Sequence, residues 1–436
     1  MTVNILGTEK IHKLFIKFCL PAVASMVIAG MQGMIDGIFV GNFTGELGLA
    51  SVNIAQPFMQ LIYGCTFVVC IGSISSMGRL LGEGSEGEAQ DVFRTSMITV
   101  LVATLVLTLV GTFFSKEVAA ILGANEEIIS GVSTYIKTIS LFAPFIALKV
   151  LFGFTDRIIG RPEEYLKATI VSVVVQIILN VIFLKFLGLG IGGAALATGI
   201  SNIAGFFVVL PYILNKKNKI NLFKGKFNSK IIWPVCYNGS SEGVTSISTA
   251  VATFLFNMAF MEIAGPAGVA AFTAITYMAN FGILLMFGIS DGITPIISYN
   301  YGNENIKRVK ESMKLSIIST FIIGLVIFLI LVIFSRPLVK MFTSTNAEVI
   351  NLASSGAKIY AFAFLINGFN IVTSGYFTAI GNAKASIIVS GSRGLVFIVV
   401  GIFVLPMFLG VNGIWLTVPF AEIVTVLIGM YMLRKH

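Results

Sequence analysis

Charged residues are scarce in this sequence. Asp, Glu, Lys and Arg make up 11% of its 436 residues, whereas soluble globular chains contain about 25%. Hydrophobic residues make up 56%, and the mean hydropathy is +0.95. These values exclude an ordinary cytosolic enzyme, a disordered chain and a small disulfide scaffold. They are typical of a membrane protein that crosses the bilayer many times.

Histidine and cysteine are also rare. The two histidines are His12 and His436, and the four cysteines lie in or beside apolar segments without metal-ligand spacing. We therefore expect no zinc site, no disulfide framework and no cofactor. No constellation of Ser, His or Cys accompanies the acidic residues, so we do not expect an enzyme.

Long apolar runs fill most of the chain. A membrane-spanning helix needs about 20 mostly apolar residues. We predict an all-α integral membrane protein with twelve transmembrane helices in two pseudo-symmetric six-helix lobes. The predicted spans lie near residues 12–40, 48–78, 92–114, 128–159, 164–187, 191–214, 231–262, 268–299, 311–334, 348–379, 384–408 and 412–433.

The two lobes follow from an internal repeat. Gly84-Ser85-Glu86 corresponds to Gly302-Asn303-Glu304, and Gly160-Arg161-Pro162 corresponds to Gly381-Asn382-Ala383. Two parallel six-helix repeats facing each other across a cavity are a transporter architecture. The predicted division is an N-terminal lobe at 1–214, a basic cytoplasmic linker at 215–230 and a C-terminal lobe at 231–436.

The basic residues indicate orientation. The net charge is +9, but it gathers at the ends of spans, so we expect no nucleic-acid partner. The linker and most short loops on its side are rich in Lys and Arg, and Arg157 and Arg161 are counted on that side. The loops predicted on the opposite side hold only Lys116, Lys185, Arg336 and Lys340. This asymmetry predicts a multi-pass protein of the cell membrane with both termini in the cytoplasm.

The linker has two interpretations. We favour a solvated connector, and binding of anionic lipid headgroups is the alternative. Membrane lipids surround the protein in either case, and we expect it to be a monomer.

Asp36 lies inside the first predicted span. An ionisable group in the bilayer costs roughly 2.5–3.5 kcal/mol, so its presence needs a reason. One interpretation is a carboxylate that reaches the outer surface or pairs with Lys137. The other is a site for a cation or a proton, which we favour.

Three neutral polar residues in later spans complete this candidate site. Gln176 and Asn180 are four residues apart and share a helical face, and Thr198 lies in the next span. With Asp36 they offer one carboxylate and three neutral oxygens, which suits a monovalent hard cation or an exchangeable proton. Asp36, Asn180 and Thr198 are the candidate Na⁺ ligands. Ordinary hydrogen bonds between helices are the alternative.

The second half has a different charged cluster. Glu242, Asp291, Arg393 and Glu422 lie roughly 12–16 Å from the cytoplasmic ends of their spans, at 1.5 Å per residue. Arg393 paired with Glu422 or Asp291 would be structural, whereas Glu242 and Asp291 are candidates for a cation-attracting cavity wall. Lys149, in the fourth span, either neutralises one of these acids or has a partner within its own half.

At this point several segments match a known family. The most specific is Thr294-Pro-Ile-Ile-Ser-Tyr-Asn300-Tyr-Gly302, and further matches are Asp36-Gly-Ile-Phe-Val-Gly41, Gly160-Arg161-Pro162 and Gly192–Thr198. Over nearly its whole length the chain resembles the multidrug and toxic compound extrusion (MATE) transporters. Ser392-Arg393 and Pro419-Phe-Ala-Glu422 look most like the MepA-like branch.

The resemblance implies multidrug efflux by cation-coupled antiport, with small organic cations or drugs as substrates. The resemblance implies that the residues of the family's cation site correspond to Asp36, Gln176, Asn180 and Thr198 in this sequence. The first helix-5 position is commonly Asn in the family and is Gln176 here, and the second is Asp in some members and is Asn180 here. Both Na⁺ and H⁺ therefore stay open as the coupling ion. The family's acid in the middle of helix 7 is not transferred to Glu242, which lies nearer the cytoplasmic end.

Two other kinds of membrane protein are alternatives to an antiporter. A lipid-linked or polysaccharide flippase of the same superfamily would need a basic cavity for phosphates, but interior acids outnumber bases in the second half. A channel would need a ring of repeated polar residues, which the spans lack.

Overall fold

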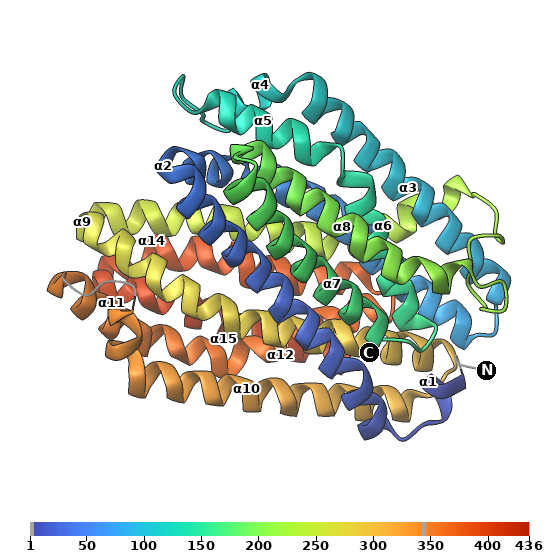
Figure 1. Ribbon diagram of the computed structural model, residues 1–436. Helices are drawn as coiled ribbons and strands as arrows, with labels where there is room; N and C mark the ends of the chain where they lie inside the picture. Colours follow the sequence, from blue (N-terminus) through green and yellow to red (C-terminus); the bar gives the residue numbers. More distant parts are fainter. Residues whose placement is uncertain (1–3, 342–345, 436) are drawn as a thin grey trace.

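The computed structural model describes residues 4–341 and 346–435, and within these ranges it is helical with no strand (Figure 1). The outermost residues of the two predicted lobes, His436 among them, lie outside the described residues. The helices of the first half are α1 (Asn4–Thr8), α2 (Ile11–Gly82), α3 (Glu86–Phe113), α4 (Ser115–Ile121), α5 (Ile129–Ser140), α6 (Ala143–Ile158), α7 (Glu163–Asn180), the π-helical η1 (Val181–Phe186) and α8 (Gly190–Leu214). Those of the second half are α9 (Ser229–Gly302), α10 (Ile306–Lys340), α11 (Ala347–Tyr360), the 3₁₀ turn η2 (Ala361–Ala363), α12 (Phe364–Ala379), α13 (Ala383–Gly391), the π-helical η3 (Ser392–Val396), α14 (Phe397–Leu409) and α15 (Val411–Arg434).

Two of these helices are far too long for one crossing of a membrane. α2 has 72 residues and α9 has 74, although about 20 suffice for the hydrocarbon layer. Each contains one glycine with a positive φ, Gly45 at 73° and Gly265 at 60°, a conformation that glycine adopts without a Cβ penalty. The two ends of α2 lie close together, since Gly7, just before α2, and Gly82, its last residue, both contact Tyr299. The chain of α2 therefore folds back on itself at Gly45.

The number of spans agrees with the sequence prediction. Nine helical stretches in the described ranges are long and apolar enough to cross a membrane, and the bent pair of α5 and α6 makes a tenth. Dividing α2 and α9 at their glycines gives the twelve spans that were expected.

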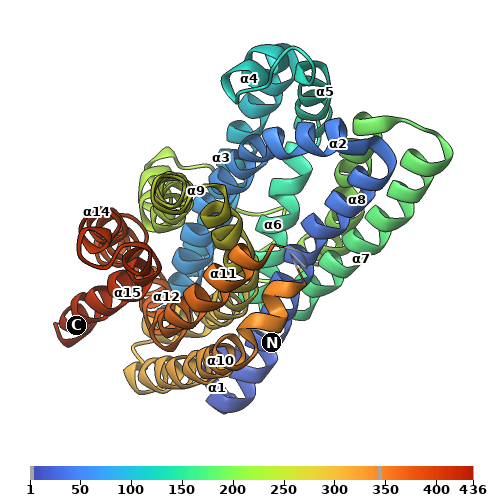
Figure 2. The same ribbon diagram turned by 90° about the vertical axis from the view of Figure 1, so that its left-hand side faces the viewer.

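Within the described residues, the two halves share a core at one end of the molecule only. We call this the terminal end, because it carries α1 and the segment 215–228. There, one buried apolar cluster combines residues of both halves, for example Phe18, Ile74 and Ile293. Toward the opposite end, the far end, the apolar clusters are separate, one running from Val40 to Ala195 and another from Phe256 to Ala421. Figure 2 shows α3 to α8 on one side and α10 to α15 on the other.

Small residues let the halves approach closely at the terminal end. A Cβ added at Gly72 of α2 would lie 1.9 Å from the carbonyl oxygen of Val235, and one at Gly239 of α9 would lie 1.8 Å from that of Val68. The backbones of α2 and α9 therefore touch here without intervening side chains.

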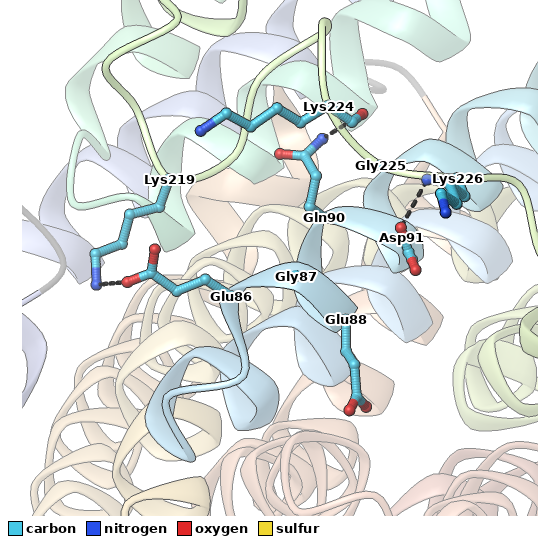
Figure 3. Close-up of a pocket in the computed structure, with 9 residues that line it drawn as sticks. All are labelled: Glu86, Gly87, Glu88, Gln90, Asp91, Lys219, Lys224, Gly225 and Lys226. Carbon is cyan, nitrogen blue, oxygen red and sulfur yellow. Dashed lines mark hydrogen bonds and ion pairs between the residues drawn. The ribbon is translucent and has the colours of Figure 1, made fainter.

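The segment between the halves is anchored along α3 (Figure 3). The Gln90 side chain donates to the carbonyl oxygens of Asn221 and Lys224 at 2.6 and 3.0 Å, and it accepts from the Asn221 amide at 2.9 Å. Lys219 pairs with Glu86. Most lysines of this segment are exposed, whereas Ile220 and Asn221 are buried.

Candidate functional site

Asp36 is buried on α2 and held by two amides of α7. Its Oδ1 accepts hydrogen bonds from Gln176 Nε2 at 3.0 Å and from Asn180 Nδ2 at 3.1 Å. The residue is 7% exposed, so it does not reach the surface. No ion pair to Lys137 is found among the described residues.

Thr198 of α8 belongs to the same cluster, because Gln176 Nε2 also contacts its Oγ1 at 3.1 Å. The four residues named from the sequence thus lie together, from three helices that are distant in the chain. Two further members were not anticipated. Gln32 donates to the Gln176 side chain, and buried Tyr135 lies close enough to interact with Asp36 and Thr198. Gln32 precedes Asp36 by four residues, a spacing that places both on one helical face.

The cluster has the donor set for a small cation. Asn180 Oδ1 is buried and has no hydrogen-bond partner within the described part of the chain. It accompanies the Asp36 carboxylate and the Thr198 hydroxyl, and hard cations bind such oxygens. Both amides turn their N–H groups to the carboxylate in this structure. A half-turn of the Asn180 amide would present its oxygen instead.

In the second half, Arg393 of η3 and Glu422 of α15 form an ion pair. Arg393 Nε and Nη2 both lie 3.2 Å from Glu422 Oε1, and Asn370 donates to Oε2 at 2.7 Å. This is one of the structural pairings considered from the sequence. Both Glu422 oxygens are occupied, and the pair ties three elements of this half together.

Asp291 pairs across the halves rather than with Arg393. Its Oδ2 lies 3.9 Å from Arg157 Nη1 of α6. The Arg157 guanidinium stands 4.7 and 4.8 Å from the ring centroids of Phe154 and Tyr165. The sequence analysis counted Arg157 only toward the positive charge of the cytoplasmic side, whereas its side chain is 1% exposed and faces an acid of the other half. An arginine near the end of an apolar run gives no signal of whether its side chain meets water or a partner from another helix.

Glu242 and Lys149 complete the predicted set. Glu242 is half-buried on α9, near Asp291 and Arg393, and its carboxylate has no ion pair or hydrogen bond among the described residues. Lys149 is buried and has its partners within the first half, where Nζ donates to Asn202 Oδ1 at 2.6 Å. Of the two interpretations of Lys149, the structure therefore agrees with the internal partner.

Comparison with known proteins identifies the family. The MatE family model matches residues 21–182 and again residues 243–403. The chain belongs to the MatE family. The two matches fall on the two halves of this MatE protein, and together they cover most of its spans.

Curated relatives align over nearly the whole chain. The multidrug export protein MepA of Staphylococcus aureus strain MRSA252 is 26% identical over 431 residues, which is 98% of this chain and 95% of the relative. MepA of Staphylococcus haemolyticus is 26% identical over 428 residues, with shares of 97% and 93%. These relatives are named as export proteins and not as enzymes, as expected for this chain.

Solved structures share the fold. A crystal structure of a MATE protein in complex with MaL6 superimposes with a TM-score of 0.93 at 22% identity, over 100% of this chain and 98% of that one. An outward-facing multidrug resistance MATE transporter gives 0.92 at 22% identity, over 100% and 97%. This similarity confirms the all-helical membrane fold with twelve spans.

Proposed function

We propose that this MatE protein exports organic, often cationic, drugs in exchange for Na⁺ or H⁺ by alternating access. The name of its relatives, multidrug export protein, supports the substrate class. The buried Asp36 carboxylate, bonded only by neutral amides, is the observation that carries the coupling. A buried carboxylate without a basic partner has a strong electrostatic preference for a cation or a proton.

Orientation and location belong to the same proposal. The lysines of the segment 215–230 lie at the terminal end, and positive residues favour the cytoplasmic side. We place that end, with both termini, in the cytoplasm of a cell whose plasma membrane holds the protein as a monomer. The far end then faces the outside, where the halves have separate cores.

Alternating access requires that the contacts between the halves at the terminal end break. Asn238 of α9 donates to Ser75 of α2 at 2.9 Å, Ser75 donates to the Thr378 carbonyl oxygen at 2.5 Å, and Arg79 donates to that of Ala379 at 3.0 Å. The Arg157–Asp291 pair lies on the same interface. These polar contacts cost little to exchange for water, so they allow the interface to open and close.

The substrate site proposed here involves Asp291 and Glu242. Both are acidic, Asp291 faces the other half, and Glu242 has no basic partner within hydrogen-bond distance in the described chain. A cationic drug between the halves would take over the electrostatic role of Arg157 beside Asp291. Its binding and the breaking of the contact between the halves would then be one event.

The coupling is tested by ethidium efflux from proteoliposomes under an imposed Na⁺ gradient and, separately, under a pH gradient. Wild type is expected to respond to one of them, and Asp36→Asn is expected to fold but lose the response. Glu46→Gln is a matched control, since Glu46 is an exposed acid of the same helix. Full gradient-driven efflux by Asp36→Asn would refute the coupling role. If folded wild-type protein binds a phosphorylated lipid and no organic cation, the flippase function is favoured over drug export.

A further inference from the structure

Lys149 is a buried cation without an anionic partner. It is 5% exposed on α6, and no carboxylate lies within salt-bridge distance of it in residues 4–341 or 346–435. Its ammonium donates to Asn202 Oδ1 at 2.6 Å and lies 3.4 Å from Ser172 Oγ. A buried charge of this kind is costly unless another group compensates it.

The fold makes room for this side chain. A Cβ at Gly205 of α8 would lie 2.8 Å from Lys149 Cδ and 2.2 Å from Ser172 Oγ. The absence of a side chain at Gly205 therefore lets the lysine stem pass between α7 and α8. The ammonium is held in a defined place and does not reach toward solvent.

A continuous polar strip joins Lys149 to the Asp36 site. On α7, Ser172 precedes Gln176 by four residues, and both are buried. Ser172 contacts the ammonium, and Gln176 donates to the Asp36 carboxylate. One helical turn separates the two contacts. On α8, Asn202 accepts from Lys149 and donates to the Thr198 carbonyl oxygen at 2.8 Å.

We infer that Lys149 is a fixed positive charge near the Asp36 site, outside direct contact with it, and that it sets the affinity of that site for the coupling cation. The inference rests on the proposed function of Asp36. A fixed positive charge beyond one helical turn and two polar contacts lowers the affinity for a second cation, so the bound ion is released readily when the site changes sides. At a separation of about 10 Å and an effective dielectric constant of about 20, one unit charge changes a binding constant by a factor on the order of ten.

The test measures the half-saturating concentration of the driving cation in proteoliposomes, from initial rates of ethidium efflux. Lys149→Met keeps the stem beside Gly205 and removes the charge, and it is expected to lower the half-saturating concentration about tenfold. Lys149→Arg keeps the charge and is expected to match wild type. Lys185→Met is the matched control, because Lys185 is an exposed lysine in η1 of the same half.

A second variant covers the case in which Lys149→Met does not fold. Asn202→Asp places a carboxylate at the position that accepts from the ammonium at 2.6 Å in wild type. It neutralises the lysine without removing it, and we expect the same fall in half-saturating concentration.

The outcomes separate the two claims. Unchanged or higher half-saturating concentrations in folded Lys149→Met and Asn202→Asp would overturn the inference, even if the maximal rate falls, and would leave the antiport proposal intact. Gradient-driven efflux that survives Asp36→Asn would refute the antiport proposal itself and the inference with it.

Discussion

The ion pair between Arg157 and Asp291 provides a direct test of how the halves open. Arg157→Met removes the cation that faces Asp291 across the interface. The acid is then left beside Glu242, a second acid, with no basic partner from the other half. Opening the terminal end to water would hydrate Asp291, so we expect the variant to populate the open state more than wild type.

The structure sets the size of this effect. At 3.9 Å the two groups are farther apart than a hydrogen bond. Their attraction is about 4 kcal/mol at an effective dielectric constant near 20, and the cost of desolvating both charges offsets much of it. A net shift of about 1–2 kcal/mol corresponds to a change of roughly 5- to 30-fold in the opening equilibrium.

Cys19 is a native reporter of this opening. Its Sγ lies 3.7 Å from the Ile289 carbonyl oxygen, and its backbone packs against Gly292, so it is buried between α2 and α9 at the terminal end. In protein whose other three cysteines are replaced by serine, labelling of Cys19 by a thiol reagent is expected to be faster in Arg157→Met than with Arg157 present.

Two further variants decide the interpretation. Arg157→Met combined with Asp291→Asn removes both members of the pair and should return the labelling rate toward wild type. Arg161→Met is the matched control, since Arg161 stands over the Tyr212 ring within the first half. Equal labelling rates in Arg157→Met and wild type, with both proteins folded, would refute the reasoning.

Three other predictions concern stability and closure. Glu422→Gln leaves Arg393 unpaired, and loss of one partner of a buried pair costs about 3–5 kcal/mol; thermal unfolding should occur at lower temperature, and Arg393→Met in the same chain should restore part of the loss. Gly239→Ala places a methyl group 1.8 Å from the Val68 carbonyl oxygen; it should force the halves apart and raise Cys19 labelling, whereas normal packing would contradict the close approach of the backbones. Gln90→Leu removes three hydrogen bonds to the segment 215–228; limited trypsin digestion should cut there faster, and an unchanged rate would show that other contacts hold the segment.

Part of the candidate site was predictable and part was not. The spacing of Gln176 and Asn180 shows that they share a helical face, but only the packing of α2, α7 and α8 brings them to Asp36. The partners of the charged residues were harder to foresee. Sequence reasoning left Arg393 with two possible acids and gave Arg157 no partner, because the burial of a residue near a helix end depends on the helices around it.

The sequence by itself determined the class of the protein, the number of its spans and their division into two similar halves. These properties depend on runs of apolar residues and on repeated turn segments, which are local along the chain. The tertiary structure alone decided that Asp291 meets Arg157, that Lys149 finds Asn202, and that the described parts of the two halves share a core at one end. Such contacts join residues more than 50 positions apart, and only the packing of whole helices selects them.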